Sequence, residues 1–180
     1  MSTSESLAVD PATELEALET FYDDTGAYLD ELADDALFEP VPTVSEWSPA
    51  QHLYHIWRAN ASMLKAANVL ADGRIETQTP DLSEDGEQAL REGSIPRRGA
   101  EAPNNMHPPD DLDRDGLRET WTRSCGKLDD VASRVDAIAD ADGGLPHPFW
   151  GTLTAAEWLR AAHVHSNHHS TIVTDILAGR

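Results

Sequence analysis

The fold of this chain is decided by the stretch Thr154-Ala-Ala-Glu-Trp-Leu-Arg-Ala-Ala-His-Val-His-Ser-Asn-His-His169. Thr154 and Glu157, three residues later, form the pattern of a capping box, so a helix is predicted to begin here and to continue almost to the C-terminus. Apolar side chains and two histidines share one arc of its helical wheel. The members of that arc are Trp158, Ala162, His165, His169, Ile172, Val173 and Ile176.

Two histidines of this helix have the spacing of a metal-binding pair. His165 and His169 are four residues apart, so both imidazoles lie on one face, one turn apart. That face points inward, whereas His163 and His168 project to its flanks as solvated or supporting residues. The alternative is a pair of core histidines that hydrogen-bond to backbone or water. Two inward imidazoles that face further histidines on another helix favour the metal site.

Three other segments also have helical periodicity. They cover about residues 11–33, 48–71 and 113–141, and the second opens with an N-cap serine followed by proline. Their apolar stripes include Leu15, Leu18, Tyr22, Leu29 and Leu32; His52, His55, Ile56, Ala59, Met63, Ala66 and Leu70; and Leu117, Trp121, Leu128, Val131, Val135 and Ile138. No segment alternates with the period of a half-buried strand. The sequence therefore predicts an all-α protein, a four-helix bundle.

The predicted domain organisation is a single domain over residues 1–180. Residues 1–10 are expected to be flexible. The connection between the second and third helices is long, residues 73–112, and is rich in Pro, Gly, Asp and Glu. A short helix is expected at about residues 84–92. A connection of this length permits the helices on either side of it to run parallel, and it is typical of a functional or disordered segment.

A third metal ligand is expected from the second helix. Both His52 and His55 lie on its apolar face, and the helical wheel does not choose between them.

Two stretches of the sequence resemble the DinB-like superfamily of bacterial four-helix bundles. The first is Trp47-Ser-Pro-Ala-Gln-His-Leu-Tyr-His55-Ile, in which a Trp leads by eight positions to a metal-binding His. The second is His147-Pro-Phe-Trp-Gly-Thr-Leu-Thr-Ala-Ala-Glu-Trp158, followed by the His165 and His169 pair. The resemblance implies a three-histidine site for a divalent metal, made by His55, His165 and His169. Many members continue with a Gln-containing turn, where this chain has Ser170-Thr-Ile-Val.

Three neutral imidazoles with an open position are typical of a catalytic site, and they suit zinc, nickel or iron. Such a metal lowers the pKa of a bound water or thiol. The resemblance implies a low-molecular-weight thiol, such as bacillithiol, mycothiol or glutathione, as a possible cofactor, and a small-molecule substrate. A metal-dependent transferase or hydrolase is the leading hypothesis. The alternative is a non-catalytic, stress-associated bundle that acts through dimerisation or a protein partner; the resemblance also implies a homodimer.

Several other residues are candidates for supporting roles. His52 is either a partner of the metal ligands or a packed core histidine. Arg97 and Arg98 form the only adjacent basic pair, which suggests either carboxylate binding to a substrate or a solvated loop. Cys125 is expected to be a small buried hydrophobe rather than a nucleophile. His147 is expected in a loop, with Phe149 and Trp150 packed under it.

The composition excludes some classes of binding partner. The net charge is -20, from 33 acidic and 13 basic residues, so binding to nucleic acid or to an anionic membrane is not expected. The absence of a signal-peptide pattern and of a long apolar run, together with a single cysteine, predicts a cytoplasmic protein without internal disulfides. The acid excess with few lysines suggests adaptation to high salt; a GC-rich genome is the alternative explanation.

Overall fold

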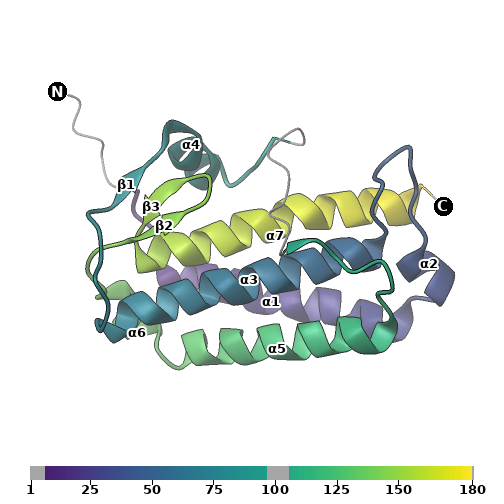
Figure 1. Ribbon diagram of the computed structural model, residues 1–180, viewed down its shortest axis with the longest axis horizontal. Helices are drawn as coiled ribbons and strands as arrows, with labels where there is room; N and C mark the ends of the chain where they lie inside the picture. The colour runs from purple at the N-terminus through teal and green to yellow at the C-terminus, as the bar shows by residue number, and fades with distance from the viewer. Residues whose placement is uncertain (1–6, 97–105, 180) are drawn as a thin grey trace.

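The computed structural model describes residues 7–96 and 106–179, and it confirms the predicted four-helix bundle (Figure 1). The four long helices are α1 (Pro11–Glu31), α3 (Pro49–Asp72), α5 (Arg114–Ala132) and α7 (Ala155–Ala178). Three shorter helices connect or extend them: α2 (Asp34–Phe38), α4 (Glu84–Glu92) and α6 (Val135–Ala139).

The long helices begin where their sequences provide caps. At the start of α7, the Thr154 hydroxyl accepts a hydrogen bond from the Glu157 backbone N–H, and Glu157 accepts one from the Thr154 N–H. The start of α3 has the same reciprocal arrangement between Ser48 and Gln51. These caps satisfy backbone donors that the first turn of a helix leaves free. The cap of α7 fixes where this helix begins, and so it fixes which face of the helix carries His165 and His169.

The long helices form a square in which α3 and α1 each pack against both α5 and α7. The colours of Figure 1 show that α3 and α5 run in one direction, whereas α1 and α7 run in the other. The long crossover between α3 and α5 permits this parallel pair, as expected from its length. Members of all four predicted apolar stripes lie at the centre of the square, where Leu18, Ile56, Leu117 and Ala162 are completely buried. Leu53 and Leu159, which the predicted stripes do not include, are equally buried.

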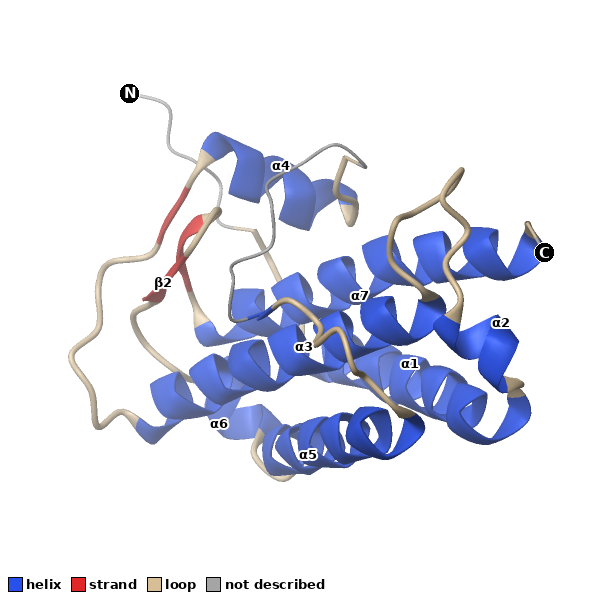
Figure 2. Ribbon diagram, turned by 45° about the vertical axis from the view of Figure 1, so that its right-hand side comes forward, coloured by secondary structure: helices blue, strands red, loops and turns tan. Residues whose placement is uncertain are grey.

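The crossover contains more structure than the sequence predicts. The short helix expected at about residues 84–92 is α4, and it is preceded by strand β1 (Asp81–Leu82). This strand pairs with β3 (Gly151–Leu153), which pairs on its other edge with β2 (Leu145–His147), so the order is β1-β3-β2, all antiparallel. Figure 2 shows this small sheet and α4 together beside the start of α7. The sheet corrects the expectation of a chain without strands.

A glycine allows β1 and β3 to approach each other. Gly151 has a φ of 86°, and a side chain there would collide with the carbonyl oxygen of Asp81. Glycine is the residue that adopts this conformation without strain. Strands of two or three residues are too short to produce a recognisable alternation of polar and apolar residues.

The third predicted helix, residues 113–141, is divided in the structure. Helix α5 ends at Ala132, and α6 begins at Val135. The side chain of Ser133 donates a hydrogen bond to the carbonyl of Asp130, and Arg134 forms an ion pair of 2.8 Å with Asp72 at the end of α3. The backbone of Arg134, with φ of -137° and ψ of 19°, leaves the helical conformation, so the prediction of one continuous helix is wrong at this point.

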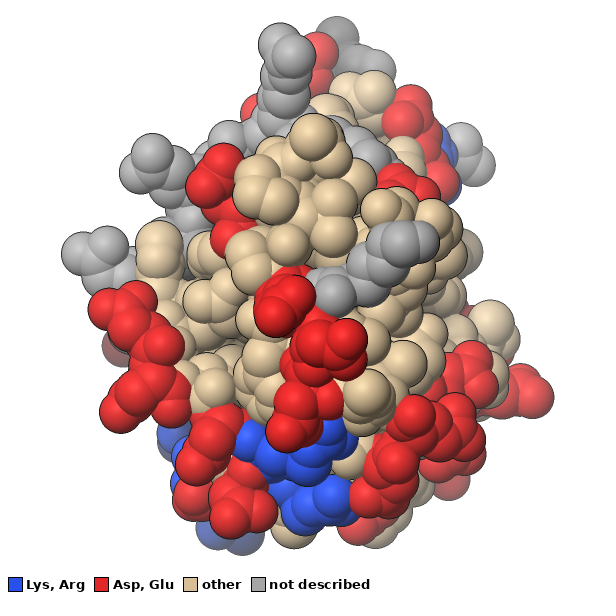
Figure 3. All heavy atoms as spheres, turned by 90° about the vertical axis from the view of Figure 1, so that its right-hand side faces the viewer, with Lys and Arg blue, Asp and Glu red and all other residues tan. Residues whose placement is uncertain are grey.

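The expectation that residues 1–10 are flexible falls largely on residues 1–6, which lie outside the described residues. Within the described ranges, no helix combines the length and hydrophobicity needed to span a bilayer. Figure 3 shows one face of the surface, on which acidic side chains surround a smaller basic cluster. The excess of negative charge is therefore plain on that face.

Candidate metal centre

The structure brings together His55 of α3 with His165 and His169 of α7. Each offers one ring nitrogen, and these three atoms all lie within 4.8 Å of one another. The Nε2 atoms of His55 and His165 are 3.1 Å apart. Because α3 and α7 are neighbouring helices of the bundle, the cluster bridges two elements that are 110 residues apart in sequence.

The tautomer of His55 follows from its second nitrogen. Its Nδ1 lies 3.0 Å from the carbonyl oxygen of Met106, which can only accept a hydrogen bond. Nδ1 therefore carries the proton, and Nε2 presents a lone pair toward His165. A metal-binding histidine typically donates its other N–H to a backbone carbonyl in this way.

His52 lies beside the cluster and not in it. Its Nδ1 is 3.0 Å from Nδ1 of His169, and its Nε2 is 2.9 Å from the hydroxyl of Ser45. If His169 donates from Nδ1 to His52, and His52 donates from Nε2 to Ser45, both nitrogens of His52 and the Nδ1 of His169 have a partner. The same assignment leaves the Nε2 lone pair of His169 free. The helical wheel could not choose between His52 and His55, but the structure does. His55 belongs to the cluster, and His52 contacts it through His169.

Burial keeps these imidazoles neutral. Desolvation lowers the pKa of His52 to about 4 and lowers the pKa of His55, His165 and His169, with repulsion from neighbouring histidines adding to the effect in each case. A neutral imidazole is the form that binds a metal ion. At pH 7 the whole cluster is therefore in its ligand form.

The residues fit a divalent transition metal. Zinc–nitrogen bonds of about 2.0–2.1 Å place tetrahedral ligands about 3.3 Å apart, close to the separation of His55 and His165. Nε2 is the atom by which His165 faces His55, and its Nδ1 is buried without a hydrogen-bond partner, so no protein acceptor holds this ring as the Met106 carbonyl holds that of His55. A cluster of three neutral imidazoles suits zinc, nickel or ferrous iron.

The two flanking histidines of α7 are both partnered. His163 Nδ1 lies 2.6 Å from the carboxylate of Glu14, which is only 7% exposed. His168 Nδ1 donates to the carbonyl of Ile95 at 3.1 Å, and its ring contacts His169. His168 is therefore a supporting residue of the cluster, as one of the two expectations for it stated.

The other candidates of the sequence are placed as follows. Arg97 and Arg98 lie outside the described residues. Cys125 is partly buried, and burial, followed by repulsion from Asp129 and Asp23, raises the pKa of its thiol to about 11. A thiol that remains protonated at neutral pH is a poor nucleophile, as expected, but Cys125 is half-buried rather than the buried residue that the sequence suggested.

His147 is in strand β2 rather than in a loop. Its ring stacks on Trp150 at a centroid distance of 4.8 Å and an angle of 17°, and it also contacts Trp158. Trp150 is buried beneath this ring, as expected. Phe149 also contacts the ring of His147, edge to face at a centroid distance of 6.2 Å, but it is 47% exposed and so is not buried with Trp150. Burial lowers the pKa of His147 to about 4, which keeps the ring neutral.

A cavity of about 1130 Å³ opens beside the histidine cluster. It is far larger than a metal ion needs, and all three clustered histidines line it. The other walls come from α3, α4, the β2–β3 hairpin and the loop before α3. Residues that line it include Trp47, Ala59, Met63, Asp85, Gln88, Ala89, Glu92, His147, Phe149, Trp150, Trp158 and Ile172. The site can therefore hold an organic molecule next to the cluster.

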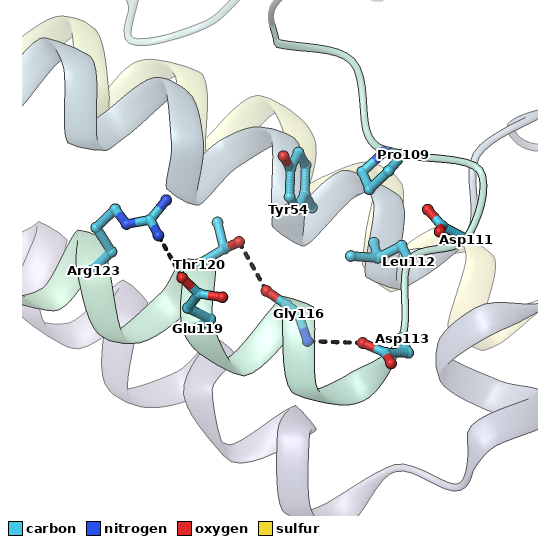
Figure 4. Close-up of a pocket in the computed structure, with 9 residues that line it drawn as sticks. All are labelled: Tyr54, Pro109, Asp111, Leu112, Asp113, Gly116, Glu119, Thr120 and Arg123. Carbon is cyan, nitrogen blue, oxygen red and sulfur yellow. Dashed lines mark hydrogen bonds and ion pairs between the residues drawn. The ribbon is translucent and has the colours of Figure 1, made fainter.

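A second pocket, of about 280 Å³, lies between α3 and the start of α5 (Figure 4). Its polar groups pair with one another. The carboxylate of Asp113 caps α5 by accepting from the Gly116 N–H, and the hydroxyl of Thr120 donates to the Gly116 carbonyl. Arg123 is paired with Glu119. Asp113, Thr120, Glu119 and Arg123 therefore stabilise the first turns of α5, and no histidine lines this pocket.

Sequence reasoning missed Met106 and Ser45, which fix the orientation of His55 and His52. Met106 acts through its backbone carbonyl, for which no sequence signal exists. Ser45 lies two residues before Trp47, and its hydroxyl also accepts the Trp47 N–H at 3.1 Å. A serine close to a histidine-bearing helix is too common a pattern to single out.

Residues 17–173 match the DinB superfamily, and the chain belongs to that superfamily. The fold is similar to the crystal structure of TT2238, described as a four-helix bundle protein, with a TM-score of 0.53 and 20% sequence identity. The similarity covers 89% of this chain and 96% of that one. At this identity the likeness concerns the fold alone. No curated protein matches the chain.

Proposed function

We propose that this chain is a single-domain, divalent-metal-dependent enzyme in which His55, His165 and His169 hold the metal. The observation that carries the proposal is the convergence of three neutral imidazoles at the wall of a large cavity. Three protein ligands leave a coordination position open, as catalytic sites require. The large cavity supports catalysis over a purely structural role, because a structural site has no need of space for an organic molecule.

When bound, a divalent metal lowers the pKa of a coordinated water or thiol and so generates a nucleophile near neutral pH. The residues of this chain would hold and orient that centre. The Met106 carbonyl holds the ring of His55, and His52 with Ser45 holds the ring of His169. We propose a low-molecular-weight thiol or water as the nucleophile and a small electrophile as substrate, which makes the reaction a transfer or a hydrolysis.

The first test is the metal content of untagged protein by elemental mass spectrometry. We expect about one zinc, nickel or iron per chain in the parent. The variants His165→Ala and His169→Ala should contain almost none. His107→Ala is the matched control, because His107 is exposed but contacts Trp47 beside the cluster. A protein that takes up no metal, even after incubation with zinc or nickel, would refute the metal site.

The second test concerns the nucleophile. The loaded protein is incubated with bacillithiol, mycothiol, glutathione or no thiol, together with a panel of electrophiles, and products are followed by mass spectrometry. Turnover that requires both a thiol and His165 supports a transferase. Turnover without thiol supports a hydrolase. Metal binding without any turnover would favour the non-catalytic bundle, and light scattering then tests whether the chain forms the homodimer on which that alternative depends.

A further inference from the structure

His147 has one ring nitrogen that is partnered and one that is open. The backbone N–H of Phe149 donates to Nδ1 of His147 at 3.2 Å, so Nδ1 carries a lone pair. The proton of the neutral ring is therefore on Nε2, which makes this nitrogen a hydrogen-bond donor. Within residues 7–96 and 106–179, Nε2 meets no acceptor, and it is not sealed inside the protein as Nδ1 of His165 is. Since His147 lines the cavity, this donor is open to a bound molecule.

The ring of His147 is held by its neighbours. It stacks on Trp150 and contacts Trp158 at a centroid distance of 5.0 Å, and both tryptophans are buried. Its backbone is in β2 and pairs with Gly151 of β3. A donor on a packed strand is presented more precisely than one on a loop. The positive charge of a metal ion in the cluster would also favour the neutral form of this ring.

The donor and the histidine cluster line the same cavity at different levels of α7. Trp158, whose ring contacts His147, is seven residues before His165 and lies on the same face of the helix. Seven residues correspond to about 10 Å along the helix axis. His147, Trp158 and His165 all line the cavity. A ligand that reaches both the cluster and the donor is therefore elongated.

The floor between these two levels is apolar. Helices α3 and α7 pack together and run in opposite directions (Figure 1), so the turns that follow His55 lie beside the turns that precede His165. Ala59 and Met63 are in those turns of α3, line the cavity and are 6% and 9% exposed. The middle of such a ligand therefore packs against apolar side chains.

We propose that His147 binds an amide carbonyl of a thiol whose sulfur lies at the histidine cluster. The Nε2–H of His147 donates to the carbonyl oxygen, and a neutral donor pairs with a neutral acceptor without bringing a further charge into the site. The chain between sulfur and carbonyl packs against Ala59 and Met63. The inference deepens the proposed function and rests on its thiol, since it names the group by which that thiol is recognised. His147 is a binding residue in this role and does not ligate the metal.

Two thiols of equal chain length test this contact. N-acetylcysteamine contains an amide carbonyl, whereas pentane-1-thiol has only carbon and hydrogen beyond its sulfur. Their binding to the zinc-loaded full chain is measured by calorimetry. His147→Phe keeps an aromatic ring but removes the donor, so it should weaken N-acetylcysteamine by about three- to tenfold relative to pentane-1-thiol. His147→Gln restores an N–H close to the position of Nε2 and should recover most of that loss.

Phe149→Leu is the matched control. The side chain of Phe149 lines the same cavity and contacts the ring of His147, but it has no polar group, and its backbone N–H remains in the variant. The relative affinity of the two thiols should therefore stay as in the parent. An equal loss for both thiols in His147→Phe would mean that this ring only shapes the cavity, and would overturn the inference.

The tautomer of His147 is tested by proton–nitrogen correlation spectra of histidine-labelled protein at pH 7, in which His147→Phe identifies the signals. We expect a proton on Nε2 and none on Nδ1. The Nε2–H signal should shift when N-acetylcysteamine is added to the zinc-loaded protein, and much less with pentane-1-thiol. A proton on Nδ1 would overturn the inference, even if both thiols bind.

The outcomes also separate this inference from the proposed function. Tight binding of both thiols without an effect of His147 would overturn the inference and leave the thiol at the metal in place. Binding of neither thiol to the zinc-loaded protein would refute the inference together with the proposed thiol. The metal-content measurement would be unaffected by either result, so the metal site is judged independently.

Discussion

The Nδ1 atom of His52 lies 3.0 Å from the Nδ1 atom of His169, and it links a histidine of α3 to a proposed ligand on α7. His52 is 4% exposed and is held on its other side by Ser45. The pair therefore forms a hydrogen-bonded chain from a loop hydroxyl to the histidine cluster. A partner of this kind sets the tautomer and the orientation of the ring that binds the metal.

Replacing His52 should weaken metal binding without removing the site. His52→Phe keeps a ring beside Trp47 but leaves Nδ1 of His169 without its partner. We expect zinc affinity to fall about 10- to 100-fold, with the stoichiometry unchanged at saturating metal. Competition with a chromogenic chelator measures the affinity, and His107→Ala serves as the control. Unchanged affinity in His52→Phe would show that the His52–His169 contact does not support the metal.

Metal binding should stabilise the folded chain. A ligand that binds only the native state at 100 times its Kd adds about 2.7 kcal/mol, which corresponds to a rise of about 5–10 °C in Tm for a chain of this size. Differential scanning calorimetry with zinc or with a chelator measures this rise. In His165→Ala the Tm should be the same in both conditions. A rise of equal size in that variant would place the stabilising metal elsewhere.

The buried carboxylate of Glu14 should contribute to stability. It contacts Arg160 at 3.3 Å and His163 at 2.6 Å, and Arg160 also donates to the carbonyl of Leu90, so the group joins α1, α7 and α4. Glu14→Gln should lower the free energy of unfolding by about 1–3 kcal/mol, because it leaves buried donors poorly satisfied. Urea denaturation measures the loss. Glu16→Gln, exposed on the same helix, should change the stability by less than about 0.5 kcal/mol.

His147 should make the stability depend on pH. Burial lowers its folded-state pKa to about 4, below the usual value near 6.5. A lowered pKa stabilises the fold fully above about pH 6.5, and this contribution disappears as the pH falls toward 4. In a chelator, the unfolding free energy of His147→Phe should therefore fall less between pH 7 and pH 4.5 than that of the parent. Allowing for partial exposure of the ring, the difference should be on the order of 1–2 kcal/mol. Parallel losses in both proteins would contradict this role of His147.

Salt should stabilise the chain. With a net charge of -20, repulsion between surface carboxylates opposes folding in dilute buffer, and screening removes it. The free energy of unfolding should rise between 0.05 and 2 M KCl, and a salt-adapted protein should lose its fold at the low end. Sucrose, which stabilises by exclusion without screening charge, is the control. A stability that is insensitive to KCl would favour the genome-composition explanation for the scarcity of lysine.

The bundle could be predicted from sequence because its signals are local. Periodicities of 3.6 residues and the caps at Ser48 and Thr154 define the long helices, and those helices are present. The break at Ser133 and Arg134 could not be read in the same way. Arg134 at the break pairs with Asp72, which is remote in sequence, and the residues 113–141 themselves carry no Gly or Pro at this point to end the helix. Strand β1 likewise depends on pairing with β3, about 70 positions away in the sequence.

The candidate site also has a part that could be predicted from sequence and a part that could not. Four-residue spacing placed His165 and His169 on one face, and the resemblance to the superfamily selected His55; the structure brings the three together. Their role as metal ligands remains a prediction. The sequence could not reveal the contact of the Met106 carbonyl with His55, or that α4 lines the cavity, because both depend on how the crossover lies over the bundle.

The position of α4 has a consequence for how such proteins diversify. The proposed metal ligands belong to two long helices whose spacing is fixed by the core, whereas α4, which lines the cavity with Asp85, Gln88 and Glu92, belongs to a connecting segment that packs against α7. Mutations of the exposed residues of α4, such as Asp85, Gln88 and Glu92, can change the charge around a bound molecule while leaving the core untouched. We therefore expect relatives with this bundle to keep the histidines and to differ in the crossover, with ligand selectivity evolving separately from the reactive centre.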